Sequence, residues 1–403
     1  MVGGQIKLLQ PGLPDAPRQP GLWRLMSEAR ELGECARQLL SALPAAAEQA
    51  PGWLWLFASP DYDLVQLVEL LQQALPETDI LACTTAGELT PQGYREGSVT
   101  GVAFARSHFT ISTALVEDMP QFDWQRAEHL AASLIEQVQS RAKAPVAGHS
   151  FALAWLDGLC EHGELLVSRL NTAFGATPVL GGSAGDDLHF THTQVIYRGR
   201  AYTDAAVVAL VNTSLPFAIF SQRHVQESDE MLVVTEADSA HRRVLELDAE
   251  PAAEVYARML GVSPAELCPT LFACNTLSVR IGGEGFVRAI QQANADGSLT
   301  FYCAVERGIV LRRNHYADML ECLHNLLAEL DQRLGTPQLL LAFDCIFRRL
   351  ELEANGRKAE AEALLQAHQA VGFSTYGEHI EGVHLNHTLT GVVIGQAGGG
   401  HDG

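Results

Sequence analysis

A short pattern of residues recurs three times along the chain and limits the folds that it can adopt. Each copy has an apolar segment, one or two hydroxyl or small residues, a glycine and an acid, followed by a second strand-like segment. The glycine–acid pairs are Gly87–Glu88, Gly185–Asp186 and Gly377–Glu378. The segments that follow them are 97–104, 203–211 and 388–394. Short apolar or alternating runs bounded by glycine are typical of strands, so we interpret the pattern as one strand–turn–strand unit built three times.

The spacing within the repeat supports this interpretation. In the first two copies the turn glycine lies 34 residues after the start of an apolar strand, from 53 to 87 and from 151 to 185. In the third copy the separation is 38 residues, from 339 to 377. A helical segment is predicted between strand and turn each time, at 64–75, 161–174 and 359–369. Such strand–helix–strand units predict parallel strands with right-handed crossovers and hence a mixed α+β (α/β) fold.

The length of the chain predicts more than one domain. A chain of 403 residues is too long for one ordinary core, and a polar stretch at 223–229 suggests where one domain ends. We therefore expect domains at 23–225 and 226–396, with flexible tails at 1–22 and 397–403. Apolar spacing also predicts one amphipathic helix over 23–43 and a short strand at 270–273.

Composition excludes several classes of partner. The net charge of −21 would repel a phosphate backbone or an anionic membrane, so we expect no nucleic-acid partner. No apolar run approaches the roughly 20 residues that span a bilayer, which predicts no membrane insertion. The N-terminal segment lacks the pattern of a secretory signal, and the eight cysteines form no C-x-x-C pair. A cytoplasmic protein with reduced thiols is expected.

One motif raises the question of hydrolysis. Residues 181–185 match the G-x-S-x-G pattern around Ser183, and Asp344 and His384 follow in the order of an α/β-hydrolase triad. That motif requires a helix directly after the serine, whereas 186–193 is predicted to be a loop leading into a strand. We therefore favour a tight turn in which glycine allows close backbone approach, and we expect no enzyme activity. Hydrolysis through Ser183 stays as an alternative.

Histidines gather around the second and third turns. The third copy contains His379, His384 and His387, and the loop after the second turn contains His189 and His192. A zinc site is a poor interpretation because there is no cysteine partner and no H-E-x-x-H motif. One imidazole is enough to hold a haem iron, since burial of the porphyrin supplies the rest of the affinity. The alternative is that these are polar turn residues that bond to the backbone.

Several of these motifs resemble those of a known family. Residues 85–88 with 97–99, and residues 181–187, resemble the FIST N-terminal domain, and residues 344–348 with 372–378 resemble the FIST C-terminal domain. The resemblance covers roughly 25–395. It implies a two-domain sensory protein of bacterial signal transduction, with repeated strand–helix–strand units and glycine turns.

The resemblance also implies a function. Members of the family include haem proteins that sense nitric oxide and regulate a separate histidine kinase of a two-component system. It therefore implies non-covalent haem b, nitric oxide or another diatomic gas as the signal, and a separate kinase as the partner. The expected iron ligand is His384, which Val383 and Leu385 flank. The other candidates, in order, are His189, His379, His387 and His192, with Gly377 and Gly185 in the same site.

A haem-free sensor is the other interpretation within binding proteins. An amino-acid-like metabolite would be held by turn amides, hydroxyl groups and the acids Glu88, Asp186 and Glu378. A homo-oligomer is compatible with either interpretation.

Overall fold

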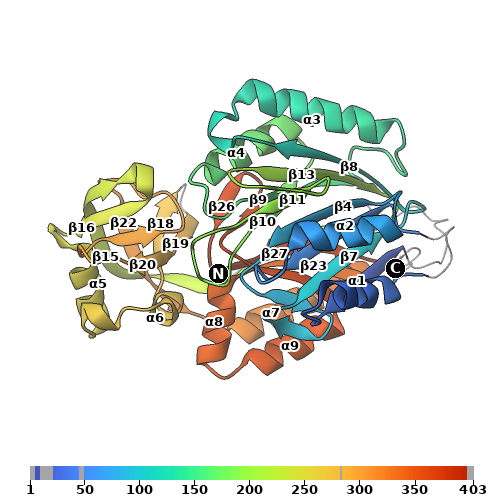
Figure 1. Ribbon diagram of the computed structural model, residues 1–403. Helices are drawn as coiled ribbons and strands as arrows, with labels where there is room; N and C mark the ends of the chain where they lie inside the picture. The colour runs from blue at the N-terminus through green and yellow to red at the C-terminus, as the bar shows by residue number, and fades with distance from the viewer. Residues whose placement is uncertain (1–4, 10–20, 45–49, 282–283, 397–403) are drawn as a thin grey trace.

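The computed structural model describes residues 5–9, 21–44, 50–281 and 284–396. It has a mixed α+β fold, as the sequence predicts, with a large body formed from three sheets and a smaller lobe beside it (Figure 1). The predicted tail residues 1–4, 10–20 and 397–403 lie outside the described part of the chain. No helix within that part is both long enough and apolar enough to cross a bilayer.

The predicted repeat is confirmed in the body, which consists of three similar units. The first has β2 (Leu22–Ser27), α1 (Leu32–Ser41), β3 (Trp53–Ala58), α2 (Leu64–Ala74), β4 (Asp79–Thr84) and β7 (Val99–Phe104). The second has β8 (Phe109–Val116), α3 (Trp124–Gln139), β9 (Ser150–Leu156), α4 (Gly163–Phe174), β10 (Val179–Ser183) and β13 (Ala206–Thr213). The third has β14 (Phe217–Arg223), α7 (Met319–Leu334), β23 (Leu339–Cys345), α8 (Ile346–Ala354), α9 (Lys358–Ala367), β24 (Ala370–Thr375) and β27 (Thr388–Ile394). In each unit two parallel strands are joined through helices: β3 with β4, β9 with β10, and β23 with β24.

Each unit gives a short hairpin to the sheet of another unit. The hairpins are β5–β6 (Glu88–Thr90, Gly93–Arg95), β11–β12 (Val195–Tyr197, Arg200–Tyr202) and β25–β26 (Glu378–Ile380, Val383–Leu385). The first pairs with β24 of the third unit, the second with β4 of the first, and the third with β10 of the second. The exchange is cyclic, so each unit depends on the others for the complete pairing of its sheet.

The inner faces of the three sheets share one hydrophobic core. Trp55 of the first unit packs edge-on against Trp155 of the second, with ring centroids 4.9 Å apart. Phe57 packs against Phe373 of the third unit at 4.8 Å. The helices cover the outer faces of the sheets and bury their own apolar stripes there. The three turns are thereby brought to one end of a common core.

The lobe is an insertion between β14 and α7. Its strands are β15 (Val225–Asp238), β16 (Arg243–Leu247), β17 (Glu250–Pro251), β18 (Leu277–Ile281), β19 (Glu284–Arg288), β20 (Ile290–Ala293), β21 (Leu299–Phe301) and β22 (Val310–Tyr316). Its helices are α5 (Ala252–Leu260) and α6 (Pro269–Cys274). The chain enters and leaves side by side, where the Ala317 amide donates to the His224 carbonyl at 2.8 Å. We call His224 and Ala317 the neck. The predicted boundary at 225–226 falls at the entry, but the chain later returns to the body, and the division into two domains stays a prediction.

Three local predictions are wrong. The predicted helix over 23–43 is strand β2 followed by α1, because β2 pairs along its length with β7 and Glu31 caps a separate helix. Residues 270–273 lie in helix α6, where Pro269 occupies the first turn. Within the predicted N-terminal tail, β1 (Gln5–Leu9) pairs with β14. In the first two cases short apolar runs suited either kind of element, and tertiary pairing decided between them.

Candidate functional site

The three glycine turns meet and bond to one another through their backbones. Six hydrogen bonds join them: Ala86 N to Ser374 O, Ser374 N to Gly87 O, Gly185 N to Thr84 O, Asp187 N to Thr85 O, Ser183 N to Gly377 O and Tyr376 N to Ser183 O. Each turn therefore contacts both of the others. We call this meeting point the hub. Its bonded amides are already satisfied and are not free to hold a metabolite, contrary to the haem-free interpretation.

Glycine is needed at the hub for close approach. A Cβ atom on Gly185 would lie 2.6 Å from the Ala86 nitrogen of the neighbouring turn. A Cβ atom on Gly377 would lie 2.3 Å from Cε1 of His384. The structure thus places both predicted site glycines at the hub, where they contact protein atoms.

Two of the three repeat acids are buried and engaged by their own turns. Glu88 accepts hydrogen bonds from Thr85 and from the amide and hydroxyl of Ser98. Glu378 accepts equivalent bonds from Thr375 and from the Thr388 amide. Burial raises the pKa of Glu88 to about 7, although these donors act in the opposite direction. Burial also raises the pKa of Glu378 well above its usual range.

The third acid, Asp186, organises the loop after the second turn. Its carboxylate accepts bonds from the amides of Phe190, Thr191 and His192 at 2.7–2.9 Å. It also accepts a bond from the Tyr376 hydroxyl on the third turn. The loop is therefore held at its start by the bond from Tyr376 to Asp186, and at its end by the bonds from the amides of residues 190–192 to the same carboxylate. The acids form the internal framework of the turns, which corrects the expectation that they hold a ligand.

His189 lies on this loop and is exposed. Its Nδ1 atom is 2.8 Å from the Asp186 carbonyl oxygen. A carbonyl oxygen can only accept, so Nδ1 carries the proton and Nε2 of the neutral ring has the free lone pair. His192 is also exposed. The adjoining Phe190 ring contacts Tyr302 of the lobe and Tyr376 of the third turn, with centroids 5.8 and 5.1 Å away.

His384 and His379 lie together on the β25–β26 hairpin, where they are paired across the two strands. His379 is fully buried beside Gly181, and burial lowers its pKa to about 3. His384 is partly buried, with its ring against Gly377. Burial lowers the pKa of His384 to about 4, while nearby Glu164 acts in the opposite direction. Both rings are therefore neutral near pH 7.

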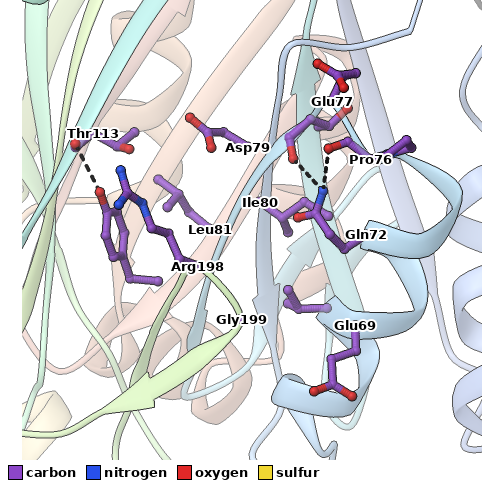
Figure 2. Close-up of a pocket in the computed structure, with 13 residues that line it drawn as sticks. Glu69, Gln72, Pro76, Glu77, Asp79, Ile80, Leu81, Thr113, Arg198 and Gly199 are labelled. Carbon is purple, nitrogen blue, oxygen red and sulfur yellow. Dashed lines mark hydrogen bonds between the residues drawn. The ribbon is translucent and has the colours of Figure 1, made fainter.

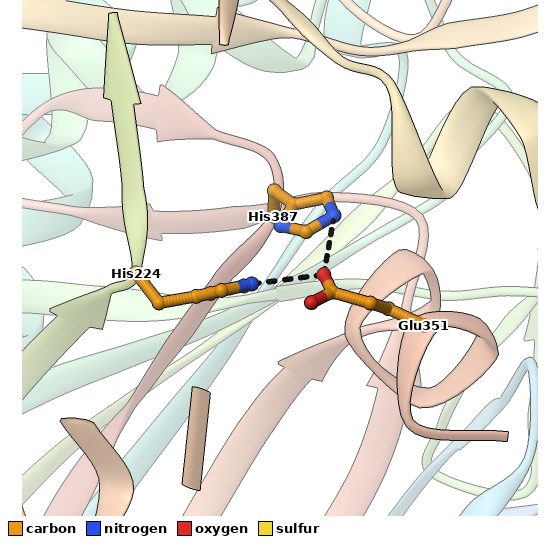
Figure 3. Close-up of side chains that lie close together, drawn as sticks. All are labelled: His224, Glu351 and His387. Carbon is orange, nitrogen blue, oxygen red and sulfur yellow. Dashed lines mark hydrogen bonds and ion pairs between the residues drawn. The ribbon is translucent and has the colours of Figure 1, made fainter. Parts of the chain in front are cut away.

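His387 lies apart from the other four candidate histidines, in a cluster that the sequence did not suggest. Its Nε2 atom is 3.5 Å from a carboxylate oxygen of Glu351, and Nε2 of His224 is 2.8 Å from the same oxygen (Figure 3). All three side chains are buried. His224 and Glu351 carry no local signal in the sequence, because 127 residues separate them and only the fold brings them together.

Two cavities lie away from the hub. One of about 550 Å³ is lined by residues of α2, β4 and the β11–β12 turn (Figure 2). Three carboxylates, those of Glu69, Glu77 and Asp79, share this lining with one cation, Arg198. The other cavity, of about 660 Å³, is lined by residues in 139–148 and 174–177. Neither lining includes a histidine, and the first would repel an anionic ligand.

Comparisons with known proteins decide the family. The model of the FIST N domain matches residues 53–250, and that of the FIST C domain matches residues 252–381. The chain belongs to the FIST family. FIST domains are generally sensory, so the resemblance inferred from the turn motifs is confirmed at that level. The lobe of this FIST protein contains the junction between the two matched domains.

Two individual proteins add little beyond the family. An uncharacterized protein of Methanocaldococcus jannaschii is 24% identical over 204 residues. This match covers 49% of the FIST chain and 38% of the relative, so the chain spans well under half of the relative's length. Cyanuric acid hydrolase from A. caulinodans is a distant structural match with a TM-score of 0.26 and 7% identity, covering 48% of this chain and 72% of that one. A similarity this low carries no argument about fold or activity.

The hydrolase alternative gains no support from the geometry of the FIST protein. Asp344 bonds to Tyr94 and Arg348, and the ring of His384 packs on Gly377. Neither residue is engaged with the other as a triad requires. Residues 184–194 form no helix after Ser183, as the sequence predicts. The backbone of Ser183 serves to join the second and third turns.

The five candidate histidines of the FIST protein differ in how accessible their ring nitrogens are to a haem iron. His379 and His387 are enclosed by protein, and Nε2 of His384 faces Gly377. His189 alone among the five candidates combines an exposed side chain with a hydrogen bond that fixes its Nε2 as the basic atom. Metal-binding histidines commonly donate their other ring proton to a backbone carbonyl in this way. Of the five candidate histidines, His189 therefore has the donor atom most accessible to a ligand outside the protein, and it is more accessible than that of His384.

Proposed function

We propose that this FIST protein is a haem-dependent sensor of nitric oxide or another diatomic gas that regulates a separate histidine kinase. The observation that carries the proposal is the bond between Nδ1 of His189 and the Asp186 carbonyl, which leaves Nε2 available to iron. When bound, haem supplies an iron atom to which the gas can attach. We assign the iron ligand to His189, in place of His384.

The residues around His189 suggest how a change at the iron would reach the rest of the molecule. The Asp186 carboxylate holds the amides that follow His189, and its other bond goes to Tyr376 at the hub. Phe190, next to His189, packs against Tyr302 of the lobe. A displacement of the histidine would therefore be felt at the hub and at the lobe, which could change a surface that a kinase recognises.

A second candidate function is the sensing of an amino-acid-like metabolite without haem. It is favoured by a charged cluster where α4 and β26 meet the lobe. Glu164 there accepts a bond from the Ala304 amide, and Arg288 and Arg242 lie close enough to stabilise its charge. The Nε atom of Arg288 is buried without a bonding partner among the described residues. An α-carboxylate would satisfy that guanidinium, and Glu164 would attract an α-ammonium group.

Visible absorption spectroscopy tests the first candidate. The full chain is supplied with haemin, and its ferric, ferrous and ferrous–nitric-oxide spectra are compared with those of His189→Ala and His192→Ala. We expect a stoichiometric Soret band that is weakened or shifted in His189→Ala and unchanged in His192→Ala, an exposed histidine of the same loop. A band that changes only in His384→Ala would transfer the ligand to His384.

The same samples separate the two candidates. If no stoichiometric haem binds, the gas-sensor proposal fails. A rise in melting temperature with one member of an amino-acid panel, absent in Arg288→Met, would then favour the metabolite sensor.

The output is tested by autophosphorylation of a candidate histidine kinase with the ferrous protein, with and without nitric oxide. Equal rates in the two states would remove that kinase as the partner.

A further inference from the structure

A continuous series of buried polar groups runs from the body to the lobe. It consists of Tyr94 on β6, Asp344 on β23, Arg348 and Glu351 on α8, His224 at the neck, His387 before β27, and the Ala273 carbonyl on α6 of the lobe. The side chains are at most 8% exposed. Burying this many polar groups is costly unless each finds a partner, so a continuous series is unlike chance packing.

The direction of each hydrogen bond in the series is fixed. Arg348 can only donate, so Nδ1 of His224, 3.2 Å from its Nη1 atom, accepts. The proton of the neutral His224 ring is therefore on Nε2, which donates to Glu351 at 2.8 Å. Nε2 of His387 donates its one proton to the Ala273 carbonyl at 2.8 Å, so its separation of 3.5 Å from the Glu351 oxygen is a close contact and not a second hydrogen bond. Burial lowers the pKa of both histidines far below neutrality, so both rings remain uncharged.

A metal site is the main competing explanation. Two histidines and a carboxylate whose ligand atoms lie within 4.8 Å of one another could hold a divalent ion. Binding through Nε2 of His224 would move the ring proton to Nδ1, where it would face the Arg348 guanidinium. Asp344 holds that guanidinium in place at 2.7 Å. A proton on Nδ1 and the N–H group of Arg348 are both donors and cannot bond to each other. The surroundings of His224 therefore favour the metal-free series.

The two ends of the series lie in the body and in the lobe, and the series passes through the neck between them. His224 is the residue at which the chain enters the lobe, and its carbonyl accepts from Ala317, where the chain leaves. Glu351 approaches both imidazoles on one side, and His387 reaches α6 of the lobe on the other. Other contacts between lobe and body include the packing of Phe347 on Tyr302 and hydrogen bonds at the surface, such as that from Arg242 to the Glu161 carbonyl at 2.8 Å.

We propose that this series is a latch that holds the lobe closed on the body, with Glu351 as the acceptor for His224 at the neck and Ala273 as the acceptor for His387. Opening of the latch releases the lobe at the neck as a local event, while both parts stay folded. Such an opening would give the lobe two positions for a signal to choose between. The proposal does not depend on which ligand the protein senses.

Hydrogen exchange of the full chain, measured by mass spectrometry, tests the latch. Glu351→Gln keeps the shape of the side chain but replaces one acceptor oxygen with a donor group. We expect amides in 224–235, 269–278 and 310–318 to exchange about tenfold faster or more, with β9 and β13 unchanged. Glu360→Gln, an exposed carboxylate on α9, is the control and should leave every segment unchanged.

A second variant covers the case in which Glu351→Gln does not fold. His224→Gln keeps an amide donor that can reach Glu351 but has no acceptor at the position of Nδ1, where Arg348 donates, so we expect faster exchange in the same three segments, by a smaller factor. Unchanged exchange at the neck, or equal acceleration throughout the body, would overturn the latch. Elemental analysis showing one equivalent of zinc or iron that is lost in the variant would overturn it as well, since both Nε2 atoms would then be ligands.

Discussion

The hydroxyl of Tyr376, on the third glycine turn, donates a hydrogen bond to the carboxylate of Asp186, on the second. The same hydroxyl oxygen accepts a bond from the Leu188 amide at 2.9 Å. A single side chain thus fastens the loop that carries His189 to the hub. Asp186 and Tyr376 are 190 residues apart in sequence, so this contact exists only when the units are assembled.

Replacing Tyr376 by phenylalanine should destabilise the protein. Removal of the hydroxyl leaves an oxygen of Asp186 and the Leu188 amide without this partner, and we expect the free energy of unfolding to fall by about 1–3 kcal/mol. Urea denaturation measures the change. Tyr62→Phe removes a single bond, from the hydroxyl to the Gly97 carbonyl at 3.2 Å, and should cost less. A Tyr376→Phe protein as stable as the wild type would show that the bond does not secure the loop.

Glu88→Gln should change how stability depends on pH. The pKa of Glu88 rises to about 7 in the folded protein through burial, against about 4.3 in an unfolded chain. The stability contributed by the neutral carboxyl is therefore present in full below pH 4 and is lost as pH rises through 7. Glutamine does not titrate, so we expect the stability of the variant relative to wild type to increase by about 3 kcal/mol between pH 4 and pH 8.

Denaturation curves at several pH values check this expectation. Glu360→Gln, which removes an exposed carboxylate, provides the comparison and should show no such trend. If the difference between Glu88→Gln and the wild type is the same at pH 4 and pH 8, folding does not raise the pKa of this carboxyl.

Gly185→Ala should disrupt the hub, because the added Cβ atom would lie 2.6 Å from the Ala86 nitrogen on the backbone of the first turn. Backbone atoms cannot move aside as a side-chain end can, and we expect a loss of about 1–3 kcal/mol or more in the free energy of unfolding. Gly163→Ala is the matched control. Its Cβ atom would be 3.4 Å from Leu156 Cδ2 at the start of α4, and we expect little change. Equal effects in the two variants would mean that the turns do not approach closely in solution.

The candidate site shows where prediction from sequence reaches its limit. The turn glycines and the histidine-rich segments were identified because each is a local feature of the chain. The ranking of His384 above His189 rested on apolar neighbours in sequence, and the structure places the His384 ring against Gly377. The exposure of His189 and its bond to Asp186 depend on how the loop is fastened to the third turn. No property of residues 186–193 alone specifies that fastening.

The sequence by itself determined the repeated strand–helix–strand units, the mixed α+β class and the positions of the turns, because periodicity and turn chemistry act over a few residues. Only the tertiary structure decided that each hairpin joins another unit's sheet. Only it decided that Glu88 and Glu378 become buried framework groups, and that His224, Glu351 and His387 meet at the neck. These outcomes depend on pairing and burial between segments up to hundreds of residues apart, and local propensity carries no information about such distant partners.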